Sequence, residues 1–247
     1  MRKIVLTFIV FVLICGSASY SSDSPPSQPD KAVPATSAVT PPVDDPATSI
    51  TVPDIDCAAL GGKEHCTAAY LMDSEINLHS AVQFAVWLEA ASRAGVKNAV
   101  IDIESGGGSL ELGYSIIKAI EYSDMNVVCI ADVKTASMAF AILESCNKRY
   151  MVKRAFLMTH QPFVSAETKP LVEDENTRLL TLATIGAYNE YIAGKLHMNY
   201  DEYSNRVKNG KMWFMDWKTA LKYHAIDKVV PSVNEVIASL RLGETLY

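Results

Sequence analysis

Two short segments carry the side chains best suited to do chemistry. Ser137 lies in DVKTASMAFAI, where a strand-to-helix turn should end, and His160 lies in FLMTHQPF, at the end of an apolar run. A serine at a helix start is usually an N-cap, and a histidine on an apolar strand is more often structural than catalytic. The alternative is a nucleophile with its general base, in which the Met138 N–H at the helix start helps to bind an oxyanion.

A third segment, ESGGGS (104–109), places three glycines after an apolar run. Glycines let backbone N–H groups approach a ligand closely, although a tight turn before a helix is the ordinary explanation. The GxGxxG pattern is absent and no phosphate-binding lysine follows, so a dinucleotide site is not predicted. The GxSxG elbow is absent too, which excludes a standard α/β-hydrolase.

The elements around these segments alternate between apolar strands and amphipathic helices. Strands are predicted at 68–72, 98–103, 126–131, 149–152 and 155–158, and helices at 78–93, 110–123, 136–145 and 171–196. Such alternation predicts a largely parallel sheet with helices on its faces, which is the α/β class. Open sheets of this class place their sites at the carboxyl ends of the strands, where all three segments fall.

Together the three segments resemble the proteolytic subunit of the Clp protease (ClpP), within the ClpP/crotonase fold. TASMA (135–139) is similar to the family's serine signature AASMG, and MTHQP (158–162) is similar to its histidine signature MIHQP. ESGGGS is similar to the family's Gly-Gly loop, and KTALKYHAIDKVV (218–230) resembles its closing segment AxEYGLIDxV. The resemblance spans about 68 to 230. It implies a mainly parallel sheet, flanking helices and a protruding helical handle.

This resemblance implies a serine endopeptidase without a cofactor. Ser137 would attack the peptide carbonyl, His160 would take and return the proton, and the N–H groups of Gly108 and Met138 would form the oxyanion hole. A peptide or an unfolded protein would bind as an added strand.

The third member of the family's triad is not matched. Counting back from YHAID (223–227), the position of the family's aspartate holds Met212. Asn209 and Asp216 are neighbours that one loop adjustment could bring in. Loss of the orienting acid costs about four orders of magnitude in a serine protease. A second interpretation is therefore a catalytically weakened or inactive oligomeric peptide-binding protein.

Two other chemistries occur on related folds. Lys134 or Lys153 could form a Ser–Lys dyad, as in signal-peptide-peptidase families, but the presence of His160 makes the dyad unnecessary. A crotonase-type acyl-CoA enzyme would use the same oxyanion logic without needing the serine and MTHQP pair. Coenzyme A is also scarce outside the cytoplasm.

The N-terminus predicts export. A basic start, a short apolar run (Ile4–Cys15) and small residues give the layout of a signal peptide cleaved after Ala18. The run is short for a membrane span, which disfavours an uncleaved anchor. The bulky Ile14 disfavours a lipoprotein attached through Cys15. We therefore expect a periplasmic or secreted protein.

The rest of the chain divides into two predicted regions. Residues 19–54 are rich in Pro, Ser and Thr and predict a flexible linker, and 55–243 predict the peptidase domain. The formal charge of −6 argues against a nucleic-acid or anionic-membrane partner. An exported protein has no ATP supply, so no ATPase partner is expected.

We also expect a homo-oligomer. An apolar stripe on the helix 171–196 could serve oligomer contacts, although a place in the core is its ordinary explanation. The stripe consists of Leu179, Leu182, Ala183, Ala187 and Tyr191.

Export also affects how the cysteines are interpreted. Cys57 and Cys66 flank a Gly-Gly turn in DCAALGGKEHC, which predicts a local disulfide in an oxidising compartment. A zinc site with His65 would have only three candidate ligands and no paired CxxC spacing, so no metal is predicted. Cys129 is either a buried thiol or a partner for Cys146.

Overall fold

The computed structural model describes residues 52–163 and 175–244. The predicted signal peptide (1–18) and the predicted linker up to residue 51 lie outside the described residues. Among the helices that the structure describes, none is long and apolar enough to cross a membrane.

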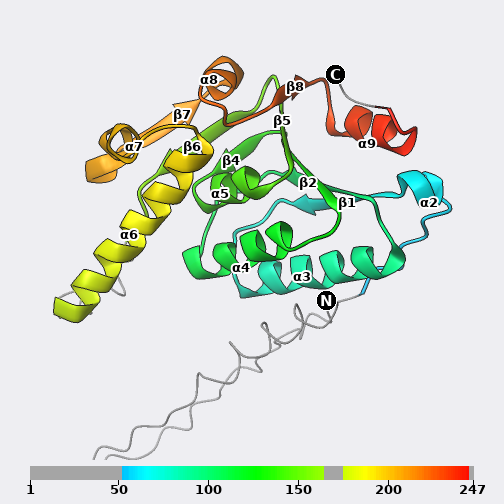
Figure 1. Ribbon diagram of the computed structural model, residues 1–247, viewed down its shortest axis with the longest axis horizontal. Coiled ribbons are helices and arrows are strands. Elements are labelled where there is room, and N and C mark those ends of the chain that lie inside the picture. Colours follow the sequence, from blue (N-terminus) through cyan, green and yellow to red (C-terminus); the bar gives the residue numbers. More distant parts are fainter. Residues whose placement is uncertain (1–51, 164–174, 245–247) are drawn as a thin grey trace, which may run out of the picture. The chain divides into compact units, whose positions relative to one another are not determined.

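Five parallel strands form the main sheet, in the order β1-β2-β3-β5-β8 (Figure 1). Their bounds are β1 Thr67–Met72, β2 Asn98–Ile103, β3 Asn126–Ala131, β5 Lys148–Val152 and β8 Lys228–Val230. Most residues of β2 and β3 are buried. Because a parallel sheet is covered on both faces, such strands appear in the sequence as continuous apolar runs. The predicted α/β class is confirmed.

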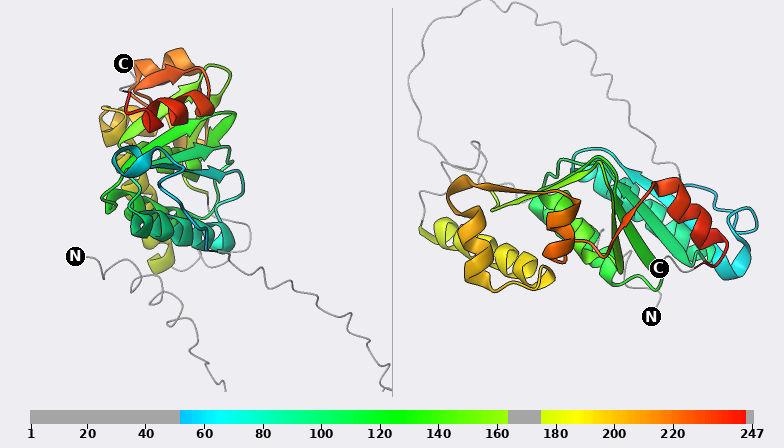
Figure 2. Two further views of the ribbon diagram at one scale, coloured as in Figure 1. Left: turned by 90° about the vertical axis from the view of Figure 1, so that its right-hand side faces the viewer. Right: turned by 90° about the horizontal axis from the view of Figure 1, so that it is seen from above.

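Helices cover both faces of this sheet (Figures 1 and 2). Helices α3, α4 and α5 pack on one face and α9 on the other, so neighbouring residues of β2 face different cores: Ile101 toward the first three and Val100 toward α9. The helix bounds are α2 Gly62–His65, α3 Leu78–Ala94, α4 Leu110–Glu121, α5 Met138–Ser145, α6 Glu175–Lys195, α7 Tyr200–Val207, the 3₁₀ turn η2 Lys208–Gly210, α8 Trp217–Lys222 and α9 Val233–Arg241.

A second sheet of three strands holds the candidate catalytic histidine. β6 (Phe156–His160) lies between β4 (Lys134–Ala136), to which it is parallel, and β7 (Met212–Met215), to which it is antiparallel. The sequence pattern did not predict β4 or β7, because three or four residues are too few to show a period. β6 extends two residues beyond the predicted strand, so His160 is its last residue.

Helix α6 protrudes from the rest of the folded unit (Figure 1). Its C-terminal half is anchored by buried residues such as Tyr188 and Ile192. The other described elements do not cover its N-terminal half, and the side chains of Leu179 and Leu182 are 52% and 51% exposed. The ordinary assignment of these two leucines to the core is therefore wrong. The predicted start of this helix, residues 171–174, lies outside the described residues.

Candidate active site

Ser137 occupies a sharp turn between β4 and α5. Its backbone has φ 56° and ψ −122°, in the left-handed region that a non-glycine residue rarely adopts. Its N–H donates to the Met158 carbonyl at 2.8 Å, which ties the turn to β6. The Ser137 side chain makes no capping hydrogen bond to α5. The usual N-cap explanation therefore does not account for this serine, and strain of this kind clusters at functional sites.

His160 is 7% exposed at the end of β6. Its Nδ1 lies 2.6 Å from the carbonyl oxygen of Gln161. A carbonyl oxygen only accepts, so Nδ1 must carry the proton. In the neutral ring the lone pair is then on Nε2, which is the arrangement a general base requires.

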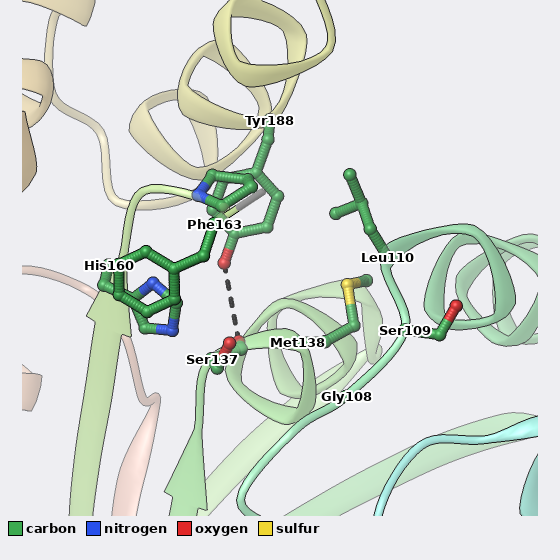
Figure 3. A pocket seen from close by; sticks show the side chains of 9 residues that line it. Gly108, Ser109, Leu110, Ser137, Met138, His160, Phe163 and Tyr188 are labelled. Carbon is green, nitrogen blue, oxygen red and sulfur yellow. Dashed lines mark hydrogen bonds between the residues drawn. The ribbon is translucent and has the colours of Figure 1, made fainter. Parts of the chain in front are cut away.

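The side chains of Ser137 and His160 face the same cavity, of about 300 Å³ (Figure 3). Its lining consists of Gly108, Ser109, Leu110, Ser137, Met138, His160, Pro162, Phe163 and Tyr188. Within the described residues no hydrogen bond joins the Ser137 hydroxyl to His160. Such bonds are often long in the absence of substrate and tighten in the complex.

The glycine loop supplies a backbone donor to this cavity. The Gly107 carbonyl accepts from the Ile76 N–H, and the Ile76 carbonyl accepts from the Ser109 N–H, each at 2.8 Å. This pairing leaves the intervening Gly108 N–H without an acceptor in the described part of the chain. The Met138 N–H, at the start of α5, also has no acceptor among the described residues. Two free donors beside a serine form the arrangement that stabilises an oxyanion.

Glycine is required in this loop by geometry. A Cβ on Gly107, at φ +97°, would lie 2.7 Å from the Ala136 carbonyl oxygen and 2.8 Å from the Met138 nitrogen. A Cβ on Gly108, at φ +149°, would overlap the backbone of Ile76. The loop can therefore pack against the start of α5 and against Ile76 only if both positions are glycine.

Met212 lies directly opposite His160 in the antiparallel pair of β6 and β7. Side chains at opposed positions of such a pair have Cβ atoms about 4.5–5.5 Å apart. A carboxylate at this position could reach the imidazole, but the thioether of Met212 can neither orient nor neutralise it.

The two candidate replacements for the acid are not paired with His160. Asp216 accepts from the Thr219 N–H at 2.8 Å and caps α8, and hydrogen bonds from Thr219 lower its pKa. It follows β7 at the end remote from Met212, about 13 Å along the strand at 3.3 Å per residue. In this structure Asp216 is therefore a helix cap and is not paired with His160.

Asn209 lies nearer, in the turn η2 with φ 60°. It lines a neighbouring hollow of about 440 Å³ together with Gln161 and Phe163. Its side chain makes no hydrogen bond to His160 among the described residues. The structure does not assign Asn209 the role of an orienting amide.

Two aromatic residues belong to the site and were missed from the sequence. The Phe163 ring stacks on the His160 imidazole, with centroids 4.2 Å apart and planes 19° apart. The Tyr188 hydroxyl, from α6, donates to the Ser137 carbonyl at 3.4 Å (Figure 3). The only sequence signal that could have indicated Phe163 is its place directly after the MTHQP motif. Nothing in the helical pattern distinguishes Tyr188 from a core residue.

Neither candidate dyad lysine lines the cavity. Lys153 lies over the Trp217 ring, 5.5 Å from its centroid, and Lys134 lies near Gly106 at the mouth of the glycine loop. The structure therefore brings neither Lys134 nor Lys153 to Ser137.

One group of carboxylates among the described residues lies close enough together to bind a cation. The oxygens of Asp102, Glu104 and Asp132 lie within 4.8 Å of one another. Arg154 already pairs with Asp132 at 2.5 Å, which offsets part of this charge. We assign no metal to this cluster, since acidic groups commonly gather without one.

The four cysteines in the described part of the chain form two pairs. A disulfide joins Cys57 to Cys66, and another joins Cys129 in β3 to Cys146 at the end of α5. Their sulfurs are thereby occupied, which leaves His65 without the partners that a zinc site would need.

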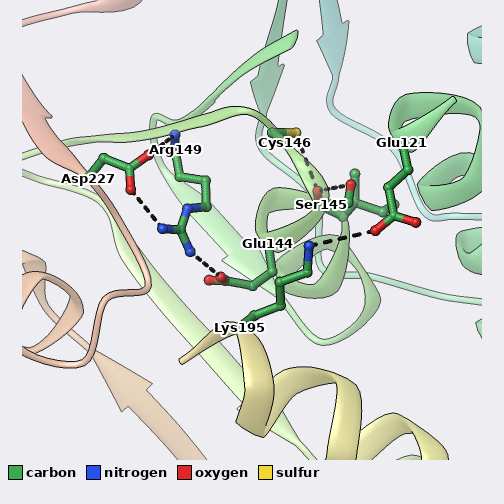
Figure 4. Close-up of polar contacts among 8 residues, drawn as sticks. Glu121, Glu144, Ser145, Cys146, Arg149, Lys195 and Asp227 are labelled. Atoms are coloured by element: carbon green, nitrogen blue, oxygen red, sulfur yellow. Dashed lines mark hydrogen bonds and ion pairs between the residues drawn. The ribbon is translucent and has the colours of Figure 1, made fainter. Parts of the chain in front are cut away.

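A buried ionic network holds the far end of α5 (Figure 4). Arg149 donates to Glu144 and to Asp227, each at 2.7 Å. The side chain of Glu144 is fully buried, and this burial raises its pKa to about 8 although Arg149 opposes the shift. The network fixes the C-terminal end of the helix whose N-terminal end carries Ser137.

Comparisons with known proteins agree with this geometry. The family model described as Clp protease matches residues 68–233, more than half of the chain, and confirms the resemblance of the three motifs. Among solved structures, a mutant of ClpP1 from Listeria monocytogenes is similar with a TM-score of 0.60 and 20% sequence identity. That match covers 70% of this chain and 95% of the other, and it shows the fold.

Proposed function

Because this chain belongs to the Clp protease family, whose members are serine-type peptidases, we propose that it hydrolyses peptide bonds through Ser137 and His160. The observation that carries the proposal is the strained turn at Ser137. Its hydroxyl makes no capping bond and shares one cavity with a histidine and two unpaired backbone N–H groups. Backbone strain clusters at functional sites, so a strained serine whose side chain does not cap the helix is expected to be a nucleophile.

The proposed reaction follows the serine-peptidase scheme. His160 Nε2 accepts the proton of the Ser137 hydroxyl as its oxygen attacks the carbonyl carbon, and the Gly108 and Met138 N–H groups stabilise the oxyanion. The proton is then delivered to the leaving amine, which departs and leaves an acyl-enzyme. Water activated by the same nitrogen hydrolyses this ester and restores the serine.

We propose that the substrates are peptides or unfolded segments and that hydrolysis needs no ATP. The predicted signal peptide supports export, and the two disulfides fit an oxidising compartment. A periplasmic or secreted enzyme would act without an ATP-driven partner. The exposed leucines of α6 support a homo-oligomer, because an uncovered apolar surface of this kind marks an interaction site.

The test is hydrolysis of quenched-fluorescent peptides by the purified protein without ATP, beside Ser137→Ala and His160→Ala. The proposal expects turnover that both substitutions reduce by at least about 10³-fold. Turnover that survives in Ser137→Ala would contradict the proposal.

A second function, binding of peptides without hydrolysis, is favoured by one observation. Met212 stands where a carboxylate would have to face His160. If this function holds, Ser137→Ala and the parent protein bind the same peptides with equal affinity and neither cleaves them. Stabilisation by an acyl-CoA in thermal unfolding would instead support the crotonase-type alternative and exclude both peptide functions.

A further inference from the structure

The plane of the His160 ring is held from one side by Phe163. The two centroids lie 4.2 Å apart and the planes differ by 19°, a stacked arrangement (Figure 3). Phe163 is 59% exposed. Because an exposed phenylalanine gains little from burial, its position over the imidazole requires another explanation.

The edge of the same ring is held by the Gln161 carbonyl, through the 2.6 Å contact to Nδ1. In a complete triad a carboxylate occupies this position. It holds the tautomer and the orientation of the ring, and it stabilises the imidazolium that forms during the reaction. A backbone carbonyl can fix the tautomer, but it carries no full negative charge.

The opposed position on β7 offers no such charge, because it is Met212. The π face of an aromatic ring attracts a cation placed over it, and this attraction is larger where water is partly excluded. Phe163 is therefore placed to stabilise the His160 imidazolium through the face of the imidazole ring, whereas the Gln161 carbonyl contacts the edge of that ring.

We propose that Phe163 and the Gln161 carbonyl together do the work that a carboxylate does in a complete triad. Phe163 is then a positioning residue that holds the imidazole plane and favours its protonated form. This inference rests on the proposed peptidase function for its kinetic consequences, but not for its effect on the protonation of His160.

Within residues 52–163 and 175–244, few other ionisable groups face this ring from the elements packed around it. Tyr188 lines the cavity from α6, and burial holds its pKa well above 10, so it stays neutral. Lys208 lines the neighbouring hollow beyond Phe163 and donates to Asn205 at 2.7 Å. β7 contributes Met212, and the glycine loop contributes no charge to the lining.

The direct test is the titration of His160 by NMR in Ser137→Ala protein, with and without Phe163→Leu. Leucine keeps the apolar volume and removes the π face. We expect the pKa of His160 to fall by about half a unit to one unit, a threefold to tenfold loss in proton affinity. Phe214→Leu is the matched control, since Phe214 is also exposed but lies on β7 against Phe156, with the two rings tilted by 48°. An unchanged pKa in Phe163→Leu, as in the control, overturns the proposal.

The titration decides the proposal even if the parent protein cleaves no peptide, because it uses a variant without the nucleophile. Failure of the peptidase function and failure of this inference are thus separate results.

Kinetics sharpen the assignment where hydrolysis is measured. Phe163→Leu should lower kcat about tenfold with little change in KM, and move the acid limb of the pH profile to lower pH. Met212→Asp should then raise kcat by a larger factor in the Phe163→Leu background than in the parent, because a new carboxylate replaces the lost stacking. Equal factors in the two backgrounds would mean that Phe163 does not share the acid's role.

Discussion

The serine side of the candidate site (Ser137, Gly107, Gly108 and Met138) and its histidine side (His160, Gln161, Phe163 and Met212) are stabilised by different means. The serine side is made of backbone: a left-handed turn, a glycine loop that no Cβ could enter, and two free N–H groups. On the histidine side the described residues hold the ring by one carbonyl and one exposed phenylalanine, and none of them brings a carboxylate to it.

The difference shows which parts of a catalytic site can diverge independently. Backbone donors depend on the fold and persist as long as α5 and the glycine loop keep their places. An orienting acid would be a single side chain on β7, and the strand pairs with β6 although Met212 occupies the position opposite His160. If the proposed peptidase function holds, the serine side keeps the backbone arrangement that this chemistry requires, and the histidine side has Met212 where a carboxylate would face His160.

Gly107→Ala is expected to disrupt the backbone of the serine side and to have the largest effect on the reactivity of Ser137. The added Cβ would collide with the Ala136 carbonyl and the Met138 nitrogen, which displaces an oxyanion donor. We expect fluorophosphonate labelling of Ser137 to slow by about 10²–10³-fold. The control is Gly62→Ala, at φ +73° with no atom within 4 Å of the added Cβ. Equal labelling rates in the two variants would contradict the assigned role of the loop.

Glu144→Gln tests how the buried network supports α5. The folded-state pKa of Glu144 is raised to about 8 from 4.5, so between these values the folded protein binds more protons than the unfolded chain. The free energy of unfolding should therefore fall as pH rises from about 4.5 to about 8, by up to about 1.4 kcal/mol per pH unit. Glutamine cannot titrate, so the variant should lose the slope between about pH 6 and about pH 8. Below about pH 6 part of the slope should remain, because burial raises the pKa of Asp102 to about 6 as well.

Urea unfolding at a series of pH values measures the slope. Glu89→Gln, which removes an exposed ion pair with Arg93, serves as the control and should leave the slope unchanged. A slope that persists in Glu144→Gln between about pH 6 and about pH 8 would mean that another buried group carries it.

Asp216→Ala should have the smallest effect on chemistry and sharpens the assignment of the histidine side. The substitution removes the cap of α8, so the melting temperature should fall. The labelling rate of Ser137 should stay within about twofold of the parent, because Asp216 lies far along β7 from His160. A loss of labelling as large as that in His160→Ala would restore Asp216 as a triad member.

The fold could be predicted from the sequence because buried parallel strands leave a strong pattern. The strands at 98–103 and 126–131 were predicted with their observed bounds. The short strands β4 and β7 could not be predicted, because their pairing depends on contacts with β6 and not on a local period.

The candidate site was predictable to the extent that its motifs are local. Ser137, His160, Gly108 and Met138 lie in segments whose residue types and order carry the signal, and the structure places all four around one cavity. Phe163 and Tyr188 were not predicted, because a ring stack and a hydrogen bond across 51 residues follow from tertiary packing. The cap position of Asp216 was not predicted, since its proximity to Met212 in the sequence does not reveal that each residue of a strand adds about 3.3 Å.

The most direct test of the account is the rate of fluorophosphonate labelling, read by intact mass, in the parent protein, His160→Ala and Met212→Asp. The account predicts slow labelling of Ser137 in the parent, none above background in His160→Ala, and labelling at least about tenfold faster in Met212→Asp. Equal rates in all three proteins would contradict it, because neither an activated serine nor a missing acid would then exist at this site.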